Sequence, residues 1–179
     1  MNELAIFTDG SLNPQMKVGV GGIMIFDNDI LQKSVQEINS RYFIDLMNFV
    51  YFQNTSSTKL EIETLLKAID DIIHNDKYEN QKINIYTDSQ GITGLMNRKE
   101  RLLNNDFIAS SSGKELKNKE LYLKFYELND KYSINIHKVK GHSQKGTQDT
   151  MTRIFSFLDK EVRRKLREFV ETNKNTFTK

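Results

Sequence analysis

The stretch Leu4-Ala-Ile-Phe-Thr-Asp-Gly-Ser11 is a short apolar run of strand type that ends in a polar turn. A second stretch, Ile83-Asn-Ile-Tyr-Thr-Asp-Ser-Gln90, ends in nearly the same way. An aspartate at the end of a strand is held at the rim of a sheet, where the sites of α/β proteins form. One such aspartate usually caps a helix or forms a turn, but two in the same context favour a pair of fixed carboxylates, Asp9 and Asp88.

Hydrophobic patterns predict the remaining elements of the chain. We expect further strands at residues 23–26, 30–38 and 134–139, with the 30–38 strand paired to the 23–26 strand. Helices are expected at residues 58–74, 91–96, 115–130 and 154–170, whereas residues 39–53 show no clear period. This order predicts one α/β domain over residues 1–179, with a variable segment at about 39–55 and a C-terminal amphipathic helix at about 152–172.

The composition excludes several classes of site. The 179 residues contain no cysteine, which excludes disulfides, thiolate nucleophiles and cysteine-ligated zinc. No apolar run approaches the ~20 residues of a membrane span, and the N-terminus lacks the basic flank of a secretory signal, so a cytoplasmic protein is expected.

The charges are distributed unevenly along the chain. Residues 1–97 carry 7 basic and 13 acidic side chains, whereas residues 131–179 carry 12 basic and 5 acidic side chains. This asymmetry favours either a metal site beside a polyanion-binding face or a dipolar surface without a partner.

The helix expected at residues 58–74 offers a third carboxylate. Glu61 shares a stripe with Leu65 and Ile72 on the flank of the apolar face, so we expect it to point toward the sheet. Glu63 lies on the solvent face of the helix, where an ion pair with Lys67, four residues later, is a sufficient reason for a glutamate. The pattern Thr58-x-x-Glu61 is also a capping box, which needs no catalytic role, so both interpretations of Glu61 are open.

The loop after the last strand carries a candidate proton carrier. In the segment Lys138-Val-Lys-Gly-His-Ser143, His142 either moves a proton at near-neutral pH or is an exposed loop residue. Asp149 follows, just before the last helix. The other two histidines, His74 and His137, are expected to be structural.

Five segments together resemble the type 1 ribonuclease H family. They are Ile6–Ser11, Thr58–Leu66, Ile85–Gln90, Lys117–Tyr122 and Val139–Ser143, in the family's order and with roughly its spacing. The resemblance implies a ribonuclease H-like fold, a five-stranded mixed β-sheet flanked by α-helices. It also implies an endoribonuclease that hydrolyses the RNA strand of RNA–DNA hybrids by a two-metal-ion mechanism.

The resemblance also implies a set of site residues. Asp9, Glu61 and Asp88 match the family's metal-binding carboxylates, which would hold two Mg²⁺ ions, with Mn²⁺ as a substitute. His142 matches the family's mobile histidine. Substrate contacts are expected from Gly10, Ser11, Ser57, Thr58 and Gln90, of which Ser57 and Thr58 stand where the family holds a phosphate.

A fourth carboxylate and the basic surfaces leave alternatives open. Asp149, seven residues after His142, is nearer to the family's spacing than Asp159, seventeen residues after it, so Asp149 is our choice and Asp159 the alternative. The basic segment at residues 97–103 either grips the substrate or is a solvated helix. Four basic side chains of the last helix, Arg163, Arg164, Lys165 and Arg167, fit its solvent face better than a specific contact, although each phosphate contact would steepen the salt dependence of binding.

The same fold could also serve two functions other than ribonuclease H activity. A non-catalytic nucleic-acid-binding module on the same fold is disfavoured because Asp9, Glu61 and Asp88 are all present. Another nuclease of the ribonuclease H-like superfamily, of the junction-resolvase or integrase type, is disfavoured by the segments 87–90 and 140–143. No separate hybrid-binding domain is recognisable, so a monomer is expected.

Overall fold

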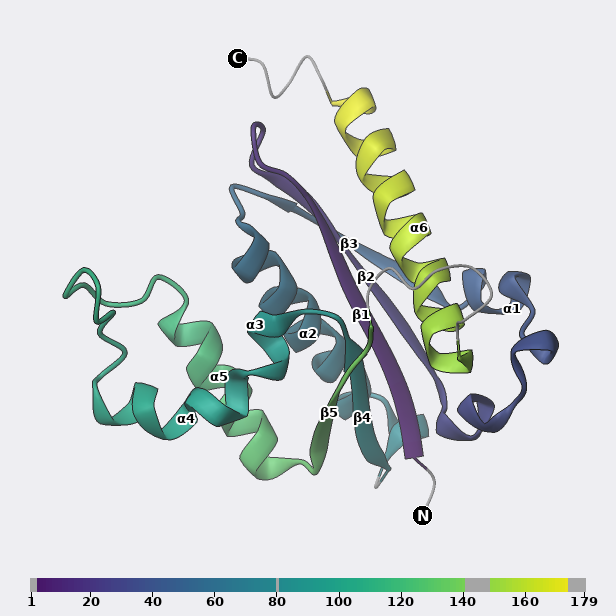
Figure 1. The fold of residues 1–179 in the computed structure, drawn as a ribbon, viewed down its shortest axis with the longest axis horizontal. Coiled ribbons are helices and arrows are strands. Elements are labelled where there is room, and N and C mark those ends of the chain that lie inside the picture. The colour runs from purple at the N-terminus through teal and green to yellow at the C-terminus, as the bar shows by residue number, and fades with distance from the viewer. Residues whose placement is uncertain (1–2, 80, 141–148, 174–179) are drawn as a thin grey trace.

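A five-stranded sheet forms the centre of the computed structural model, which describes residues 3–79, 81–140 and 149–173 (Figure 1). The strands are β1 (Glu3–Asn13), β2 (Val18–Asp27), β3 (Met47–Gln53), β4 (Lys82–Thr87) and β5 (Ile134–Lys138), in the spatial order β3-β2-β1-β4-β5. The β1–β2 and β2–β3 pairs are antiparallel, whereas the β1–β4 and β4–β5 pairs are parallel. The predicted five-stranded mixed sheet is therefore confirmed.

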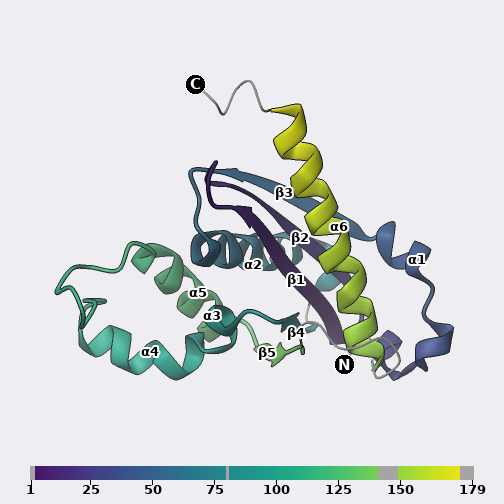
Figure 2. The same ribbon diagram turned by 45° about the horizontal axis from the view of Figure 1, so that its top comes forward.

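Helices cover both faces of this sheet (Figures 1 and 2). They are α1 (Ser40–Ile44), α2 (Ser57–Ile73), α3 (Gln90–Thr93), α4 (Leu95–Asn104), α5 (Lys119–Lys131) and α6 (Thr150–Thr172), with short 3₁₀ turns η1 (Asn28–Gln32), η2 (Val35–Glu37) and η3 (Asp76–Tyr78). The helices α2, α3 and α5 pack on one face with α4 beside them, and α6 with α1 packs on the other. Within the described residues, no helix is both long and apolar enough to cross a membrane.

Strand β1 is buried on both faces because it lies between two hydrophobic cores. Leu4 and Ile6 belong to the core that β1 shares with α2 and α5, whereas Ala5 and Phe7 belong to the core beneath α6. Side chains along a strand alternate between the two faces of the sheet. Asp9, two residues after Phe7, is therefore on the face that α6 covers.

Two glycines of β2 let helices approach the sheet closely from both sides. A Cβ at Gly21 would lie 2.0 Å from the Thr64 Oγ1 of α2, and a Cβ at Gly22 would lie 2.3 Å from the Val162 Cγ2 of α6. Such distances leave no room for any side chain, which is a common reason for glycine within a strand. Helices α2 and α6 are thus fixed directly against the strand beside β1, one on each face.

The expectation of a strand at residues 30–38 is wrong. This segment forms the turns η1 and η2, and the strand that pairs with β2 is β3 (Met47–Gln53). At η2, Ser34 and Glu37 form a capping box, in which the Ser34 backbone N–H donates to the Glu37 Oε2 at 2.9 Å. Three apolar side chains of the segment, Ile30, Leu31 and Ile38, pack against the core beneath α6 without strand pairing. Residues 39–55 contain α1 and the edge strand β3.

Candidate active site

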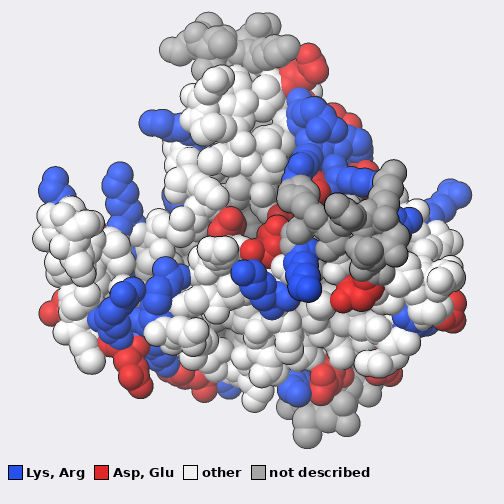
Figure 3. Space-filling model, in the orientation of Figure 1, with Lys and Arg blue, Asp and Glu red and all other residues white. Residues whose placement is uncertain are grey.

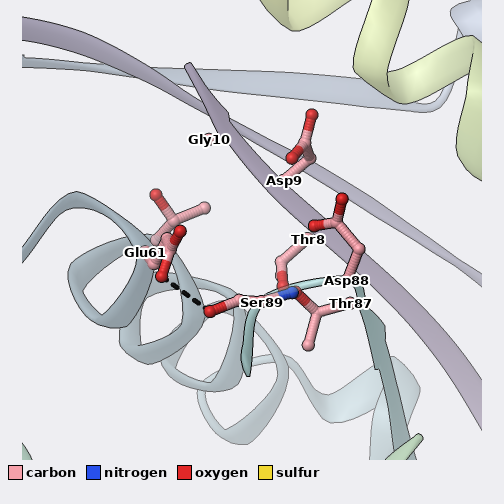
Figure 4. A pocket seen from close by; sticks show the side chains of 8 residues that line it. Thr8, Asp9, Gly10, Glu61, Thr87, Asp88 and Ser89 are labelled. Carbon is pink, nitrogen blue, oxygen red and sulfur yellow. Dashed lines mark hydrogen bonds between the residues drawn. The ribbon is translucent and has the colours of Figure 1, made fainter. Parts of the chain in front are cut away.

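The parallel pairing of β1 with β4 brings Asp9 and Asp88 together just beyond the last pair of this ladder, although β1 itself continues to Asn13. Phe7 lies opposite Tyr86 in this pair, and each aspartate follows two residues later. Phe7 and Tyr86 both belong to the core beneath α6, so alternation along β1 directs Asp9 to that face. Asp88 comes directly after the end of β4. Figure 4 shows the two carboxylates extending from neighbouring strands into the same space. Their charges interact, since Asp88 raises the pKa of Asp9.

Glu61 reaches the same place from α2, on the opposite side of β1. The Ser57 Oγ donates a hydrogen bond of 3.3 Å to one carboxylate oxygen of Glu61. The Ser89 Oγ donates a hydrogen bond of 2.6 Å to the other oxygen, as Figure 4 shows. Ser89 also caps α3, because its Oγ accepts a hydrogen bond of 3.1 Å from the Ile92 backbone N–H. The orientation of the Glu61 carboxylate is therefore set from both sides by hydroxyl groups.

The capping-box interpretation of Thr58 and Glu61 is wrong. Helix α2 begins at Ser57, and its N-cap is Ser56, whose side chain accepts a hydrogen bond of 3.4 Å from the Lys59 backbone N–H. Glu61 is therefore in the second turn of the helix rather than at its cap. Its carboxylate is directed toward the pocket described next, which supports the functional interpretation.

A small pocket unites the three carboxylates. It is lined by Thr8, Asp9, Gly10, Glu61, Thr64, Thr87, Asp88 and Ser89, from β1, α2, β4 and the turn after β4. All of its polar side chains are carboxylates or hydroxyls, which are the oxygen ligands that Mg²⁺ prefers. Within the described residues, no three histidine, aspartate or glutamate side chains are arranged to hold a metal ion as they stand. Figure 4 shows that the Glu61 carboxylate is turned toward Ser89, away from the two aspartates.

The pKa of Asp9 is raised from its ordinary value of 3.8 to about 7. Burial is the largest cause, because it disfavours the charged form, and the charges of Asp88 and Asp159 add to it. The Gly10 backbone N–H, which donates a hydrogen bond to Asp9, and the charge of Arg163 act in the opposite direction. Crowded carboxylates of this kind are stabilised by a bound cation, so the donor set fits a divalent metal ion.

The raised pKa of Asp9 predicts that removing its charge stabilises the metal-free protein. The folded state holds a proton on Asp9 more tightly than the unfolded chain does, so stability falls as the pH rises from about 4 to about 7. In EDTA at pH 8, we expect Asp9→Asn to raise the free energy of unfolding by on the order of 1–4 kcal/mol. The gain should shrink toward pH 4, where Asp9 is protonated in both states. Urea unfolding across this pH range measures the effect, and a variant less stable than the parent at pH 8 would contradict it.

The two candidates for the fourth carboxylate are in different places. Asp149 is the N-cap of α6, where its side chain accepts a hydrogen bond of 2.7 Å from the Thr152 backbone N–H. Hydrogen bonds from the side chain and the backbone N–H of Thr152 hold the pKa of Asp149 below its ordinary value. Neither Asp149 nor Asp159 lines the pocket. Asp159 is on α6 itself and is close enough to Asp9 to raise its pKa. The charge of Asp159 thus acts on Asp9, which favours Asp159 over Asp149 as the fourth carboxylate.

The remaining candidates are spread around the rim. Gly10 lines the pocket, Ser11 follows it on β1, and Ser57 contacts Glu61. Thr58 is exposed on α2, and Gln90 is the exposed first residue of α3. His142 lies outside the described residues.

One polar contact in the pocket was not predicted. The local sequence pattern assigns no role to Ser89, although its hydroxyl donates a hydrogen bond to Glu61. The repeated pattern, in which a hydroxyl residue follows each aspartate, could have indicated it. The Glu61–Ser89 contact itself joins residues 28 positions apart and is visible only in three dimensions.

Comparisons with known proteins all lead to one family. The RNase H family model matches residues 1–153. A Ribonuclease HI of Haemophilus influenzae is 32% identical over 148 residues, which cover 79% of each chain. A Ribonuclease H of Ruthia magnifica is 26% identical over 144 residues, which cover 80% of this chain and 86% of the relative.

The fold has a counterpart among solved structures. The solution structure of the PFV RNase H domain superposes with a TM-score of 0.63 at 18% identity, and the match covers 92% of this chain and 94% of that domain. This likeness concerns the fold, whereas the family match extends over most of the sequence. This chain belongs to the RNase H family.

Proposed function

We propose that the protein is a metal-dependent endoribonuclease that hydrolyses the RNA strand of RNA–DNA hybrids. Membership of the RNase H family supports ribonuclease H activity in general. The observation that carries the finer proposal is the meeting of Asp9, Glu61 and Asp88 in one pocket from β1, α2 and β4. A protein that only bound nucleic acid would have no use for three carboxylates there, since they repel phosphate.

Four carboxylates of this chain would hold the metal. We assign this role to Asp9, Glu61 and Asp88 and, in place of Asp149, to Asp159. When bound, a pair of Mg²⁺ or Mn²⁺ ions would activate a water molecule and stabilise the charge that develops on the leaving 3′ oxygen. The raised pKa of Asp9 supports the assignment of Asp159, because both Asp88 and Asp159 contribute to it.

The neighbouring side chains position these carboxylates and the substrate. Ser57 and Ser89 orient Glu61 through its two oxygens. Gly10 brings the backbone of β1 close to α2, since a Cβ there would lie 3.2 Å from Leu60. Ser11, Thr58 and Gln90, at the rim, would contact the backbone and 2′-hydroxyl groups of the substrate, and a 2′-hydroxyl is what distinguishes RNA from DNA. For His142 we propose proton transfer near neutral pH.

A panel of four labelled duplexes and strands tests this function. RNA–DNA hybrid, RNA–RNA, DNA–DNA and single-stranded RNA are each incubated with Mg²⁺, with Mn²⁺ and with EDTA. We expect cleavage of the RNA strand of the hybrid alone, and its loss in EDTA. If the hybrid binds but is not cut with either metal, the protein is a binding module and the proposed reaction is wrong.

A further inference from the structure

Helix α6 carries a row of basic side chains on the surface that it turns to solvent. Lys160, Arg163 and Arg167 are exposed and follow one another at spacings of three and four residues, which places them on one face of a helix. Leu158, Val162 and Leu166, on the other side of α6, are buried against the sheet. We call Lys160, Arg163 and Arg167 the α6 basic stripe. It begins beyond residue 153, where the match to the family model ends.

The stripe starts at the edge of the candidate active site. Arg163 is close enough to Asp9 to lower its pKa, and its Nε donates a hydrogen bond of 2.7 Å to the Asp159 carboxylate. Arg167 comes one turn later and lines a hollow between α6 and the β1–β2 turn, together with Asn13 and Gln15. Figure 3 shows basic side chains gathered over α6, beside the acidic patch in the middle of the same face. The stripe therefore leads from the carboxylates toward the β1–β2 turn.

Among the described residues, not every charge of the stripe has an acidic partner. Arg164, on the neighbouring flank, is held by Glu161 and Glu168. In contrast, within residues 3–79, 81–140 and 149–173, neither Lys160 nor Arg167 forms an ion pair or a side-chain hydrogen bond. Two exposed cations beside an acidic pocket favour a partner that carries regularly spaced negative charge.

We propose that the α6 basic stripe binds the phosphate backbone of the nucleic acid that lies across the active site. From Lys160 to Arg167 the helix advances by ~10.5 Å, at 1.5 Å per residue. One strand of a duplex advances by ~3.4 Å per nucleotide, so this length matches about three phosphates. The stripe thus extends the substrate site along α6, and because its contacts are to phosphate, it adds affinity rather than sequence preference. This inference rests on the proposed function.

The salt dependence of hybrid binding tests whether the α6 basic stripe contacts phosphate, with a matched control variant. Both pairs of substitutions are made in an Asp88→Asn background, so that a labelled RNA–DNA hybrid is bound and not cut. The test variant is Lys160→Gln with Arg167→Gln. The control is Lys67→Gln with Lys77→Gln, which removes the same charge from α2 and η3. The dissociation constant is measured at several KCl concentrations, and thermal unfolding verifies that each variant is folded.

We expect the test variant to lower the slope of log Kd against log [KCl] by about two, because each phosphate contact contributes about one. Affinity should fall by about tenfold, or ~1.4 kcal/mol. The control should keep the parent slope, and Lys160→Arg with Arg167→Lys should restore it. If the test and control variants have the same slope while the parent binds the hybrid, the inference is wrong and the proposed function stands. If the parent does not bind the hybrid at all, the proposed function itself fails.

Discussion

Replacing Asp88 by asparagine is expected to lower the rate of hybrid cleavage by at least about 10³-fold, since metal ions contribute several kcal/mol and each 1.36 kcal/mol is worth tenfold. The asparagine side chain has the shape of the aspartate but neither its charge nor its second carboxylate oxygen. Because Asp88 interacts with Asp9, the loss affects both aspartates of the site. Asp9→Asn should have an effect of the same size.

Binding of the hybrid should survive in both variants. The nucleic acid is a polyanion, and each substitution removes one negative charge from the surface that would face it. The carboxylates hold the metal, whereas contacts to phosphate come from other side chains and from the backbone. We therefore expect a dissociation constant in EDTA that is equal to or lower than that of the parent.

Single-turnover cleavage and binding in EDTA measure the two effects separately. The matched control is Asp70→Asn, which alters an aspartate on the solvent-facing side of α2, beside His74. It should cleave the hybrid at the parent rate. If Asp9→Asn and Asp88→Asn both cleave at that rate, the assignment of the site is wrong.

The local pattern of the sequence was sufficient to predict the two central strands and the three carboxylates. An apolar run followed by Thr-Asp is recognisable within a few residues, and the parallel pair β1–β4 then brings Asp9 and Asp88 together. The expected end of the first strand at Asp9 is wrong, because β1 continues to Asn13. Helical phase placed Glu61 on the sheet side of α2 and Glu63 on the other. The pocket contains Glu61, and Glu63 does face outward, although it pairs with Lys59 at 3.8 Å rather than with Lys67.

The edge of the sheet was not predictable in the same way. Ile30, Leu31 and Ile38 are apolar because they cover the core beneath α6, and burial alone does not distinguish a strand from short 3₁₀ turns. In β3, aromatic residues occur on both faces of the strand, so the sequence shows no alternation of polar and apolar residues. Phe49 packs toward α6, whereas Tyr51, also on that side, is 46% exposed and contacts Phe169. Pairing with the glycines of β2 identifies the strand, and that pairing is a long-range contact.

Spacing along the chain favours Asp149 as the fourth carboxylate, but spacing does not reveal where α6 crosses β1. Asp149 is nearer to His142 in sequence, but it is at the start of a helix of 23 residues. Gly22, on β2, fixes the crossing point, because Val162 of α6 packs directly on it. Asp159 lies three residues before Val162, so the crossing carries it, and not the helix N-terminus, to Asp9.

Asp159→Asn is therefore expected to lower cleavage by about 10²-fold or more and to raise the Mg²⁺ concentration needed for half-maximal activity, since a lost metal ligand costs several kcal/mol. The Asp159 side chain is 25% exposed and shares a hydrogen bond with Arg163. Asparagine keeps the size of the side chain, so the packing of α6 on β2 should be unchanged. The Mg²⁺ titration is the decisive measurement, because a purely structural defect would lower activity without changing the metal requirement.

Asp149→Asn is the matched comparison and should stay within about threefold of the parent, because asparagine is as good an N-cap as aspartate. Asp149→Ala should instead lower the free energy of unfolding by about 1 kcal/mol, through loss of the cap to the Thr152 N–H, with the metal requirement unchanged. If instead Asp149→Asn raises the Mg²⁺ requirement and Asp159→Asn does not, then Asp149 is the fourth metal-binding carboxylate. Because the two variants remove the same charge from the same helix, their difference reports position alone.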